Sequence, residues 1–465
     1  MSDPLLSISP IDGRYQEQTA PLREWFSEFA YIRFRVRVEI AYLLFLSCRL
    51  GKPRPLTDAE QERLQRVADS FSLPEALRVH ELESLTRHDV KALELFLREQ
   101  FQAAGLHDLI PWIHFSLTSE DVNSTAQAWA LLESRQRVIL PALDLLLSRL
   151  TALAREHAAL PMPARTHGQI AVPTTFGKEI AVFLARLQPL RRALADHRFQ
   201  AHWSGAVGNF NAAVAAFPET DWPAFARDFL ASLGLEWHPC ATQILPYENW
   251  LEYFSHLYRV NTVLLDLVQD LWRYISDGYL HLRVVQQEVG SSTMPQKVNP
   301  IDFENAEGNL GLANALIEHY QRKLPISRLQ RDLSDSTVRR TFGVMFGHTL
   351  VAWQAILRGL ERLQVQPTVM EQALEAHWEM VAEGAQTILR AAGYAEAYDW
   401  LKTLTRGQVL TPAAYQQWVE SLPVAAEVKE RLLSLSPKTF TGLAEQLARA
   451  VTDGRPPAHE PFDSH

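Results

Sequence analysis

Apolar side chains recur at helical spacing over several long stretches of this chain, and this periodicity most constrains its fold. One stripe on a single helix face consists of Leu143, Leu146, Leu147, Leu150 and Ala154. A second stripe consists of Val260, Leu264, Leu267, Leu271 and Ile275, and residues 304–323 and 342–364 also have the pattern of long helices. The alternation of apolar and polar residues that is typical of strands is scarce. The chain is therefore predicted to be all-α, with a central bundle of long helices.

Clusters of Gly and Pro divide the chain into three predicted domains. The boundaries fall at residues 105–111 and at Gln366-Pro367. The predicted domains are an N-terminal helical domain (1–110), a central long-helix bundle (111–365) and a C-terminal helical domain (366–465). From about residue 453 the Pro-containing tail is expected to be disordered. The stretch from about 203 to 247, also rich in Gly and Pro, is predicted to be irregular.

Charge and cysteine content exclude several classes of function. The 465 residues include 45 basic and 54 acidic side chains, so the net charge of −9 opposes general binding to nucleic acid or to an anionic membrane. The two cysteines, Cys48 and Cys240, form no Cys-x-x-Cys pair, which argues against zinc and redox motifs. No signal peptide and no apolar run of about 18 residues is present, so we expect a cytoplasmic protein.

The segment Gly290–Pro300 is the most informative for chemistry, with the sequence Gly-Ser-Ser-Thr-Met-Pro-Gln-Lys-Val-Asn-Pro. Its hydroxyl groups, backbone amides, Lys297 and Asn299 are well suited to bind a carboxylate. Taken by itself, a loop of this composition is more often a polar turn between helices.

This segment resembles the signature of the fumarase/aspartase superfamily, Gly-Ser-Ser-x-Met-Pro-x-Lys-x-Asn-Pro. Further segments resemble motifs of one of its families, the adenylosuccinate lyases, in their longer bacterial form. These segments are Ser9–Tyr15, Thr86–Lys91, Thr118–Asp121, Arg165–Gln169, Leu324–Arg328 and Gln330–Asp332. The resemblance implies a fumarase/aspartase-like, all-helical subunit of three domains. It also implies a homotetramer whose active sites are each assembled from three subunits.

The resemblance implies a lyase that needs no cofactor or metal and acts in purine biosynthesis. Such an enzyme eliminates fumarate from adenylosuccinate, giving AMP, and from succinylaminoimidazole carboxamide ribotide, giving AICAR. One alternative is argininosuccinate lyase, whose signature Gln296 also resembles, or another fumarate-releasing member of the superfamily. Another is a noncatalytic helical scaffold that has kept the lyase fold, since a fold can persist after its catalytic activity is lost. A nucleic-acid-binding module is opposed by the net charge.

Eliminating fumarate requires removal of a proton next to a carboxylate, so donors must stabilise the dianion that forms. The departing nitrogen must be protonated, and an imidazole suits that donation. The resemblance assigns His167 as the general acid and Ser291 as the general base. A serine hydroxyl is a weak base, so Ser291 would act as an alkoxide stabilised by Lys297 and backbone amides in a closed site. By pattern alone, His167 would more often be a helix-start or core histidine.

The remaining predicted site residues are implied by the resemblance to bind the substrate. They are Arg14, Tyr15, Arg87, His88, Asp89, Thr118, Ser119, Gln243, Ser292, Lys297, Val298, Asn299, Asn305, Arg331, Ser336, Thr337, Val338, Arg339 and Arg340. Cations in this set would hold the nucleotide phosphate.

Several of these residues also have a plain structural interpretation. Thr118 and Ser119 are equally suited to capping a helix, and Arg331, Arg339 and Arg340 taken alone would form a solvated helix face. His88 by itself would be a surface residue, whereas in the motif Asp89 is expected to hold its tautomer. Two positions depart from the family pattern: Arg87 replaces a smaller polar residue or Lys, and Ala213 replaces His.

Overall fold

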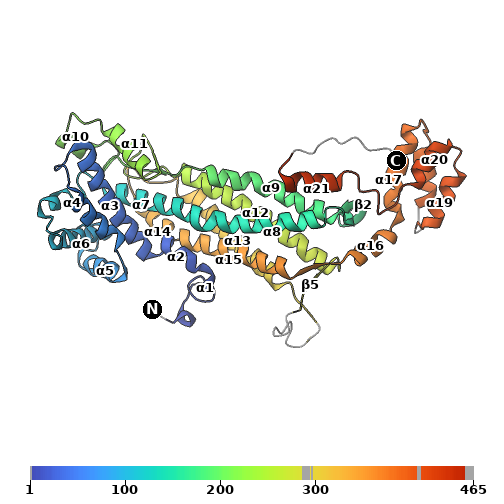
Figure 1. Ribbon diagram of the computed structural model, residues 1–465, viewed down its shortest axis with the longest axis horizontal. Helices are drawn as coiled ribbons and strands as arrows, with labels where there is room; N and C mark the ends of the chain where they lie inside the picture. Colours follow the sequence, from blue (N-terminus) through green and yellow to red (C-terminus); the bar gives the residue numbers. More distant parts are fainter. Residues whose placement is uncertain (1–2, 285–293, 295–296, 406–409, 456–465) are drawn as a thin grey trace. The chain divides into compact units, whose positions relative to one another are not determined.

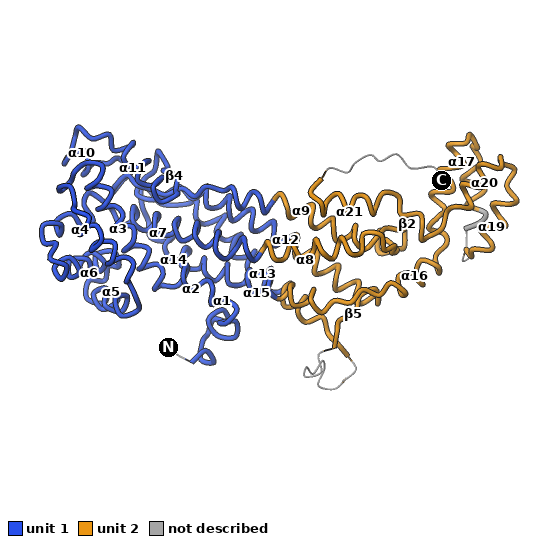
Figure 2. The backbone as a smooth tube through the Cα atoms, in the orientation of Figure 1, with its two compact units in different colours: residues 1–142, 190–262, 308–354 blue, residues 143–189, 263–307, 355–465 orange. Residues whose placement is uncertain are grey.

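The computed structural model describes residues 3–284, 294, 297–405 and 410–455, and helices dominate these parts of the chain (Figure 1). The chain divides into two compact units, each made of three stretches of sequence (Figure 2). Unit 1 comprises residues 1–142, 190–262 and 308–354, and unit 2 comprises residues 143–189, 263–307 and 355–465. This division does not test the predicted split into three sequential domains, which stays a prediction.

Unit 1 begins with short helices, followed by a cluster of helices that share one apolar core. Its elements before residue 142 are α1 (Gln16–Thr19), α2 (Arg23–Phe26), α3 (Glu28–Leu50), α4 (Asp58–Asp69), α5 (Leu73–Thr86), α6 (Asp89–Ala103), the 3-10 helix η3 (His107–Trp112), α7 (Ser119–Ser134) and a π-helical turn (Arg135–Ile139). Buried side chains of α3 to α6, among them Val36, Leu64, Val79 and Phe96, form the core. This core fixes the position of α3, against which α7 packs.

Long helices supply the bundle that the apolar stripes predict. They are α8 (Leu140–Glu156), α9 (Phe176–Asp196), α12 (Glu248–Ser276), α13 (Ile301–Lys323) and α15 (Phe342–Arg362). The stripe residues Leu143 and Leu150 of α8, and Val260 and Leu271 of α12, are completely buried. The prediction of long helices is thus confirmed. None of the described helices is both long enough and apolar enough to cross a membrane.

Unit 2 adds a β-hairpin and a group of short C-terminal helices. Its further elements are β1 (Pro161–Thr166), β2 (Gln169–Thr175), β5 (Leu280–Leu282), β6 (Leu363–Val365), α16 (Pro367–Glu375), the 3-10 helix η5 (Trp378–Val381), α17 (Ala382–Ala391), α18 (Ala397–Thr405), α19 (Pro412–Ser421), α20 (Ala426–Leu433) and α21 (Ala444–Asp453). The antiparallel pairs are β1 with β2 and β5 with β6. Residues such as Leu389, Val419 and Leu432 form a separate apolar core of the C-terminal helices.

The stretch predicted to be irregular contains regular structure that the Gly and Pro content obscured. It holds α10 (Asn211–Ala216), α11 (Trp222–Ser232) and β4 (Glu236–Trp237), which pairs in parallel with β3 (Gln200–Ala201). Asp221 caps α11 by accepting a hydrogen bond from Ala224 N at 3.0 Å. Phe225 and Phe229 then pack on Tyr42. The cap and the aromatic pair, spaced one helical turn apart, stabilise the helix. Pro223 in its first turn is tolerated, because an amide there would have no partner within the helix.

The start of α9 packs against the end of α8 through a position that has no room for a side chain. Gly177 N donates a hydrogen bond to His157 O at 2.9 Å. A Cβ atom at Gly177 would lie 2.3 Å from Ala154 O and 2.6 Å from Ala158 Cα. Both are backbone atoms, so the two helices could accommodate a methyl group only by moving apart.

We predict that Gly177→Ala lowers the free energy of unfolding by about 1–3 kcal/mol, because the added methyl group overpacks this helix contact. Urea denaturation measures the change. The matched control is Gly308→Ala in α13, where an added Cβ has no neighbour within 4 Å. Its higher helix propensity should leave stability unchanged or raise it by up to about 1 kcal/mol. Equal losses in the two variants would contradict the packing argument.

Candidate active site

The first turn of α7 in unit 1 presents two of the predicted substrate-binding residues. Thr118 is the N-cap residue, with extended backbone, and Ser119 begins the helix. Thr118 N donates to Asp121 Oδ2 at 2.8 Å, so the turn is closed by its own carboxylate. Capping and substrate binding are compatible here, because the N-terminus of a helix attracts anions through its free amide groups and its dipole.

The segment that leads into this turn is held in a conformation that few side chains adopt. His114 and Ser116 both have left-handed backbone, with φ of 57° and 59°. The buried Glu39 carboxylate holds the segment by accepting from His114 N at 3.2 Å and pairing with His114 Nδ1 at 2.6 Å. Tyr42 OH also donates to Phe115 O at 3.0 Å. Burial lowers the pKa of His114, but the Glu39 carboxylate outweighs that effect and raises it overall.

Next to the turn, Glu120 is buried and forms the centre of an ion-pair network. Its Oε1 atom lies 3.1 Å from both Arg331 Nη2 and Arg339 Nη2. Asp335 of α14 (Ser334–Arg339) lies 3.3 Å from each of the same two guanidinium groups. Tyr247 OH donates to Asp335 Oδ2 at 2.5 Å. Burial would raise the pKa of Glu120, but Arg339 and Arg331 lower it overall.

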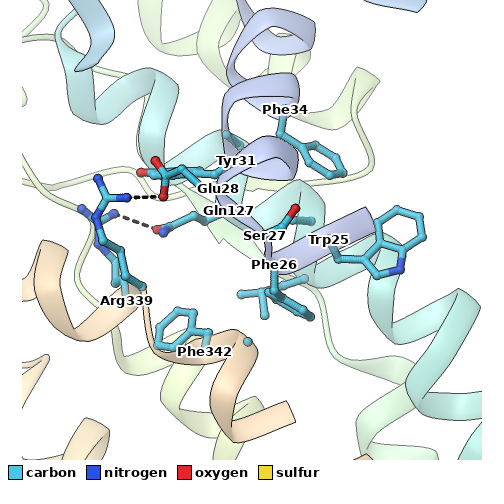
Figure 3. A pocket seen from close by; sticks show the side chains of 14 residues that line it. Trp25, Phe26, Ser27, Glu28, Tyr31, Phe34, Gln127, Arg339 and Phe342 are labelled. Carbon is cyan, nitrogen blue, oxygen red and sulfur yellow. Dashed lines mark hydrogen bonds and ion pairs between the residues drawn. The ribbon is translucent and has the colours of Figure 1, made fainter. Parts of the chain in front are cut away.

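The network gives two of the predicted phosphate-binding arginines different surroundings. The Arg339 side chain is 1% exposed, and its Nη1 also donates to Gln127 Oε1 at 2.9 Å (Figure 3). The Arg331 side chain is 21% exposed and lies at the edge of the network. Arg339 is therefore neutralised within the protein, whereas Arg331 keeps contact with solvent.

Arg340 follows α14 and lies at a pocket of unit 1 that the aromatic residues Trp25, Phe26, Tyr31, Phe34 and Phe342 line (Figure 3). The pocket has a cavity volume of about 50 Å³. Arg340 Nη1 lies 2.5 Å from Glu28 Oε2, and its Nη2 lies 3.8 Å from Asp89 Oδ2. Both Arg340 and Glu28 are partly exposed, so an incoming phosphate could replace the Glu28 carboxylate.

The other residues predicted on α14 differ in exposure. Ser336 and Val338 are half-buried, and Thr337 is exposed. Near the N-terminus, Arg14 is exposed and Tyr15 is half-buried, immediately before α1. A second pocket is lined by Asp12, Arg23, Glu28 and Arg340, so the chain next to Arg14 approaches Arg340.

His88 and its neighbours lie where α5 ends and α6 begins. Arg87 ends α5 with left-handed backbone, φ 54°, and His88 is the N-cap residue of α6. His88 Nδ1 accepts from Lys91 N at 3.1 Å, which leaves Nε2 to carry the proton in the neutral ring. Asp89 pairs with the buried Arg35 at 2.5 Å, and its Oδ1 atom lies 3.8 Å from His88 Nδ1, beyond hydrogen-bond distance. The backbone amide of Lys91, and not the Asp89 carboxylate as the motif suggested, thus determines which ring nitrogen of His88 carries the proton.

Gln243 joins two loops of unit 1. Its Nε2 atom donates to Ala206 O at 2.9 Å, and its backbone N donates to Gln330 O at 3.2 Å. The second bond ties Gln243 to the segment that leads to Arg331. Ala213, the position where the family pattern predicts His, is a buried residue of α10.

His167 lies in unit 2, at the tip of the β1–β2 hairpin. Thr166 pairs with Gln169, which leaves a two-residue turn of His167 and Gly168 with φ of 52° and 76°. Positive φ at both positions is the geometry of a type I′ hairpin turn. The imidazole is exposed. His167 is therefore neither a helix-start nor a core histidine. The His167-Gly168 pair is the sequence signal for this hairpin turn, and the prediction of helices from periodicity overlooked it.

The signature loop is described only in part. Ser291 and Ser292 lie outside the described residues. Lys297 is exposed, and its backbone N donates to Met294 O at 3.1 Å. Val298 and Asn299 are half-buried immediately before α13, and Asn305 is half-buried within that helix. Among the residues the structure describes, no group of three or more His, Cys, Asp or Glu side chains could hold a metal ion.

Sequence reasoning missed the buried groups that support the predicted residues. These groups include Glu120, Asp121, Asp335 and His202. Adjacent acids in the first turn of a helix after a Thr cap are usually surface residues, so this pattern did not indicate that Glu120 and Asp121 are buried and need cations from elsewhere. No local pattern marks Asp335 or His202.

Comparison with known proteins identifies the family. The family described as "Lyase" matches residues 13–314, and the family "Adenylosuccinate lyase C-terminal" matches residues 327–441. The chain is 44% identical to an adenylosuccinate lyase of Legionella pneumophila (strain Corby), over 96% of this chain and 99% of the relative. It is 42% identical to an adenylosuccinate lyase of Escherichia coli (strain K12), over 95% and 97% of the two chains.

The chain belongs to the adenylosuccinate lyase family. Solved structures agree on the fold. A fumarate lyase from Mesorhizobium sp. BNC1 superposes with a TM-score of 0.74 at 21% identity, over 93% of this chain and 97% of that chain. A 3-carboxy-cis,cis-muconate lactonizing enzyme from Pseudomonas putida gives 0.73 at 20% identity, over 93% and 96% of the two chains. The predicted adenylosuccinate lyase family and fumarase/aspartase-like helical fold are both confirmed.

In this adenylosuccinate lyase family member, we predict that Glu120→Gln lowers the free energy of unfolding at pH 7 by about 3–5 kcal/mol, because it leaves buried Arg339 undercompensated. Because the folded-state pKa of Glu120 is lowered, the ionised carboxylate stabilises the fold above the unfolded-state pKa of about 4.3. This contribution is lost as the pH falls through the folded-state value. Urea denaturation between pH 7 and pH 3 should therefore show the two proteins converging in stability.

The control for this prediction is Glu81→Gln, which removes an exposed partner of Arg78. Its effect should stay within about 0.5 kcal/mol. A loss at Glu120 no larger than that of the control would show that the buried network does not stabilise the fold.

Proposed function

We propose that this protein eliminates fumarate from adenylosuccinate, giving AMP, and from succinylaminoimidazole carboxamide ribotide, giving AICAR. The observation that carries the proposal is the match to adenylosuccinate lyases along nearly the whole chain, with 96% of it aligned at 44% identity. Both substrates join a succinyl group to a ribose phosphate through nitrogen. One site that binds these two common parts can therefore serve both reactions.

The carbon–nitrogen bond breaks after a proton leaves the carbon next to a succinyl carboxylate. We assign Ser291 to remove that proton and His167 to protonate the departing nitrogen. Lys297, Asn299 and loop amides would stabilise the dianionic carboxylate as it forms. The exposed imidazole at the tip of the β1–β2 hairpin supports this role, because it is free to enter a site built by other residues.

Unit 1 supplies the groups assigned to the substrate's carboxylates and phosphate. The amide end of α7 at Thr118 and Ser119 suits a succinyl carboxylate. Arg331 and Arg340, both with partly exposed side chains, suit the phosphate, with Arg14, Tyr15 and Ser336 as further contacts. His88 and Gln243 are assigned to the nucleotide. The buried Arg339 would act by holding Glu120 and Asp335 in place beside Arg331.

The active protein is proposed to be a homotetramer in which each site combines residues of three subunits. Large apolar side chains exposed on the long helices support an oligomer. Leu145 of α8, Trp272 of α12 and Leu312 of α13 are 58%, 43% and 53% exposed. Apolar surface of this kind on a helical bundle is commonly covered by another chain.

The first test is the reaction itself. We predict that the purified protein releases fumarate from adenylosuccinate, followed by absorbance, and shows no turnover with argininosuccinate under the same conditions. Argininosuccinate lacks a phosphate, so it offers no group for the phosphate-binding arginines of unit 1. Turnover of argininosuccinate alone would assign the protein to the competing activity, and turnover of neither substrate would favour a noncatalytic scaffold.

The second test concerns the shared site. We predict that His167→Ala and Ser291→Ala each lower turnover by on the order of a hundredfold or more, because each removes a proton-transfer group. Coexpressed with different tags, the two variants should form mixed tetramers that recover up to about a quarter of wild-type activity, since half of the chains supply each intact residue. Analytical ultracentrifugation confirms the assembly. Mixed tetramers without any recovery would place both residues of a site in one chain.

A further inference from the structure

His202 is a buried histidine that lies between two segments assigned above to substrate binding. It follows β3 directly and is 0% exposed. Its Nδ1 atom lies 2.8 Å from Asp121 Oδ1 in α7, and its Nε2 atom lies 3.0 Å from Thr242 O. Thr242 immediately precedes Gln243. The ring therefore spans the distance between the first turn of α7 and the Gln243 segment.

The backbone of His202 is fixed to the same helix. His202 N donates to Ser124 Oγ at 3.2 Å, and the Ser124 hydroxyl lies 3.4 Å from His202 O. Ser124 and Asp121 are three residues apart, so they share one face of α7. Because α7 holds both the backbone and the ring, His202 has no freedom to follow an independent movement of Thr242.

The Asp121 carboxylate also accepts hydrogen bonds from the backbone of two loops. One oxygen, Oδ2, accepts from Thr118 N at 2.8 Å. The other, Oδ1, accepts from Ser204 N at 2.8 Å and from Gly205 N at 3.2 Å. The same carboxylate thus sets the Thr118 turn and the start of the loop that contains Ala206, whose carbonyl accepts from the Gln243 side chain.

The loop after Gly205 lies directly against the Thr242 segment. Gly208 has φ of 82°, and a Cβ atom there would lie 1.9 Å from Ala241 O. This approach leaves room only for glycine. The loops on both sides of His202 are therefore in backbone contact, and a change in the ring's two attachments would shift Gln243 relative to Thr118.

The charge state of the ring follows from its partners. A carboxylate faces Nδ1 at 2.8 Å, and Nε2 faces the Thr242 carbonyl at 3.0 Å and the Ser204 hydroxyl at 3.1 Å. The carboxylate and the carbonyl both favour a protonated ring nitrogen. Burial lowers the pKa of His202, but the Asp121 carboxylate outweighs it and raises the pKa overall. The other charged or titratable groups that act on the ring are Glu120 of α7 and His238, which follows β4.

We propose that His202 is a positioning residue of the lyase site, whose ring ties Asp121 to Thr242 and so fixes Thr118 and Ser119 relative to Gln243. The inference rests on the proposed function, since that function assigns these residues to the substrate. Contacts of this kind hold the substrate in the ground state and the transition state alike. Their loss raises KM more than it lowers kcat.

Two substitutions break the bridge at opposite ends. In His202→Asn the amide nitrogen replaces Nδ1 and leaves Thr242 O unpaired, and in His202→Gln it replaces Nε2 and leaves Asp121 undercompensated. With adenylosuccinate we expect both variants to raise KM about tenfold or more, with kcat within about threefold of wild type. The matched control is His197→Gln, a buried histidine of the same segment whose ring contacts Phe199 and Tyr253 instead; its KM should not change.

A double-mutant cycle with Asp121→Asn completes the test. Because Asp121 and His202 act through one contact, the double variant should raise KM no more than the more affected single variant. Unchanged KM in both His202 variants, or fully additive effects in the cycle, would overturn the inference. If the His202 variants do not fold, Asp121→Asn decides by itself, and an unchanged KM there overturns it. Wild-type protein without activity on adenylosuccinate would instead refute the proposed function, and the inference with it.

Discussion

Two neighbouring carboxylates in the first turn of α7 determine the arrangement of unit 1 around the candidate site. Glu120 is neutralised by Arg331 and Arg339, and Asp121 by His202 and three backbone amides. A buried carboxylate is tolerated only where cations and donors meet it. Every segment that supplies such a partner is therefore fixed relative to α7. The half-buried motif residues Thr118 and Ser119 are held in place by these contacts.

Support of this kind suits a site that must bind a substrate with several negative charges. Arginines that bind a phosphate repel one another and must be held in place before the substrate arrives. Here Asp335 and Glu120 hold Arg331 and Arg339, while Glu28 holds Arg340. The acids thus balance the charge of the arginines and keep the guanidinium groups oriented.

Unit 2 presents its candidate acid in a different way. His167 occupies an exposed hairpin turn whose left-handed backbone is stabilised by the strand pairing on each side. The turn thus presents the imidazole on the surface of unit 2. An exposed catalytic group is consistent with a site completed by another chain, as the proposed tetramer requires.

Sequence reasoning succeeded where the information is local. Helical stripes such as Leu143 to Ala154 repeat every turn, and a buried face must show that repeat whatever it packs against. It failed for the β1–β2 hairpin and for α11, because a two-residue turn and a single cap are weak signals beside abundant Gly and Pro. It also could not separate Arg339 from Arg340, which are adjacent in sequence.

The sequence by itself thus determined the helical class, the family and the set of polar residues from which the site is drawn. The tertiary structure decided which of those residues are buried and with what partners: that Arg339 is enclosed by Glu120 and Asp335 while Arg340 stays partly open, and that His202 bridges Asp121 and Thr242. The reason is physical. Periodicity and motifs act over one helical turn, whereas the pairing of buried charges depends on residues up to 219 positions apart that only folding brings together.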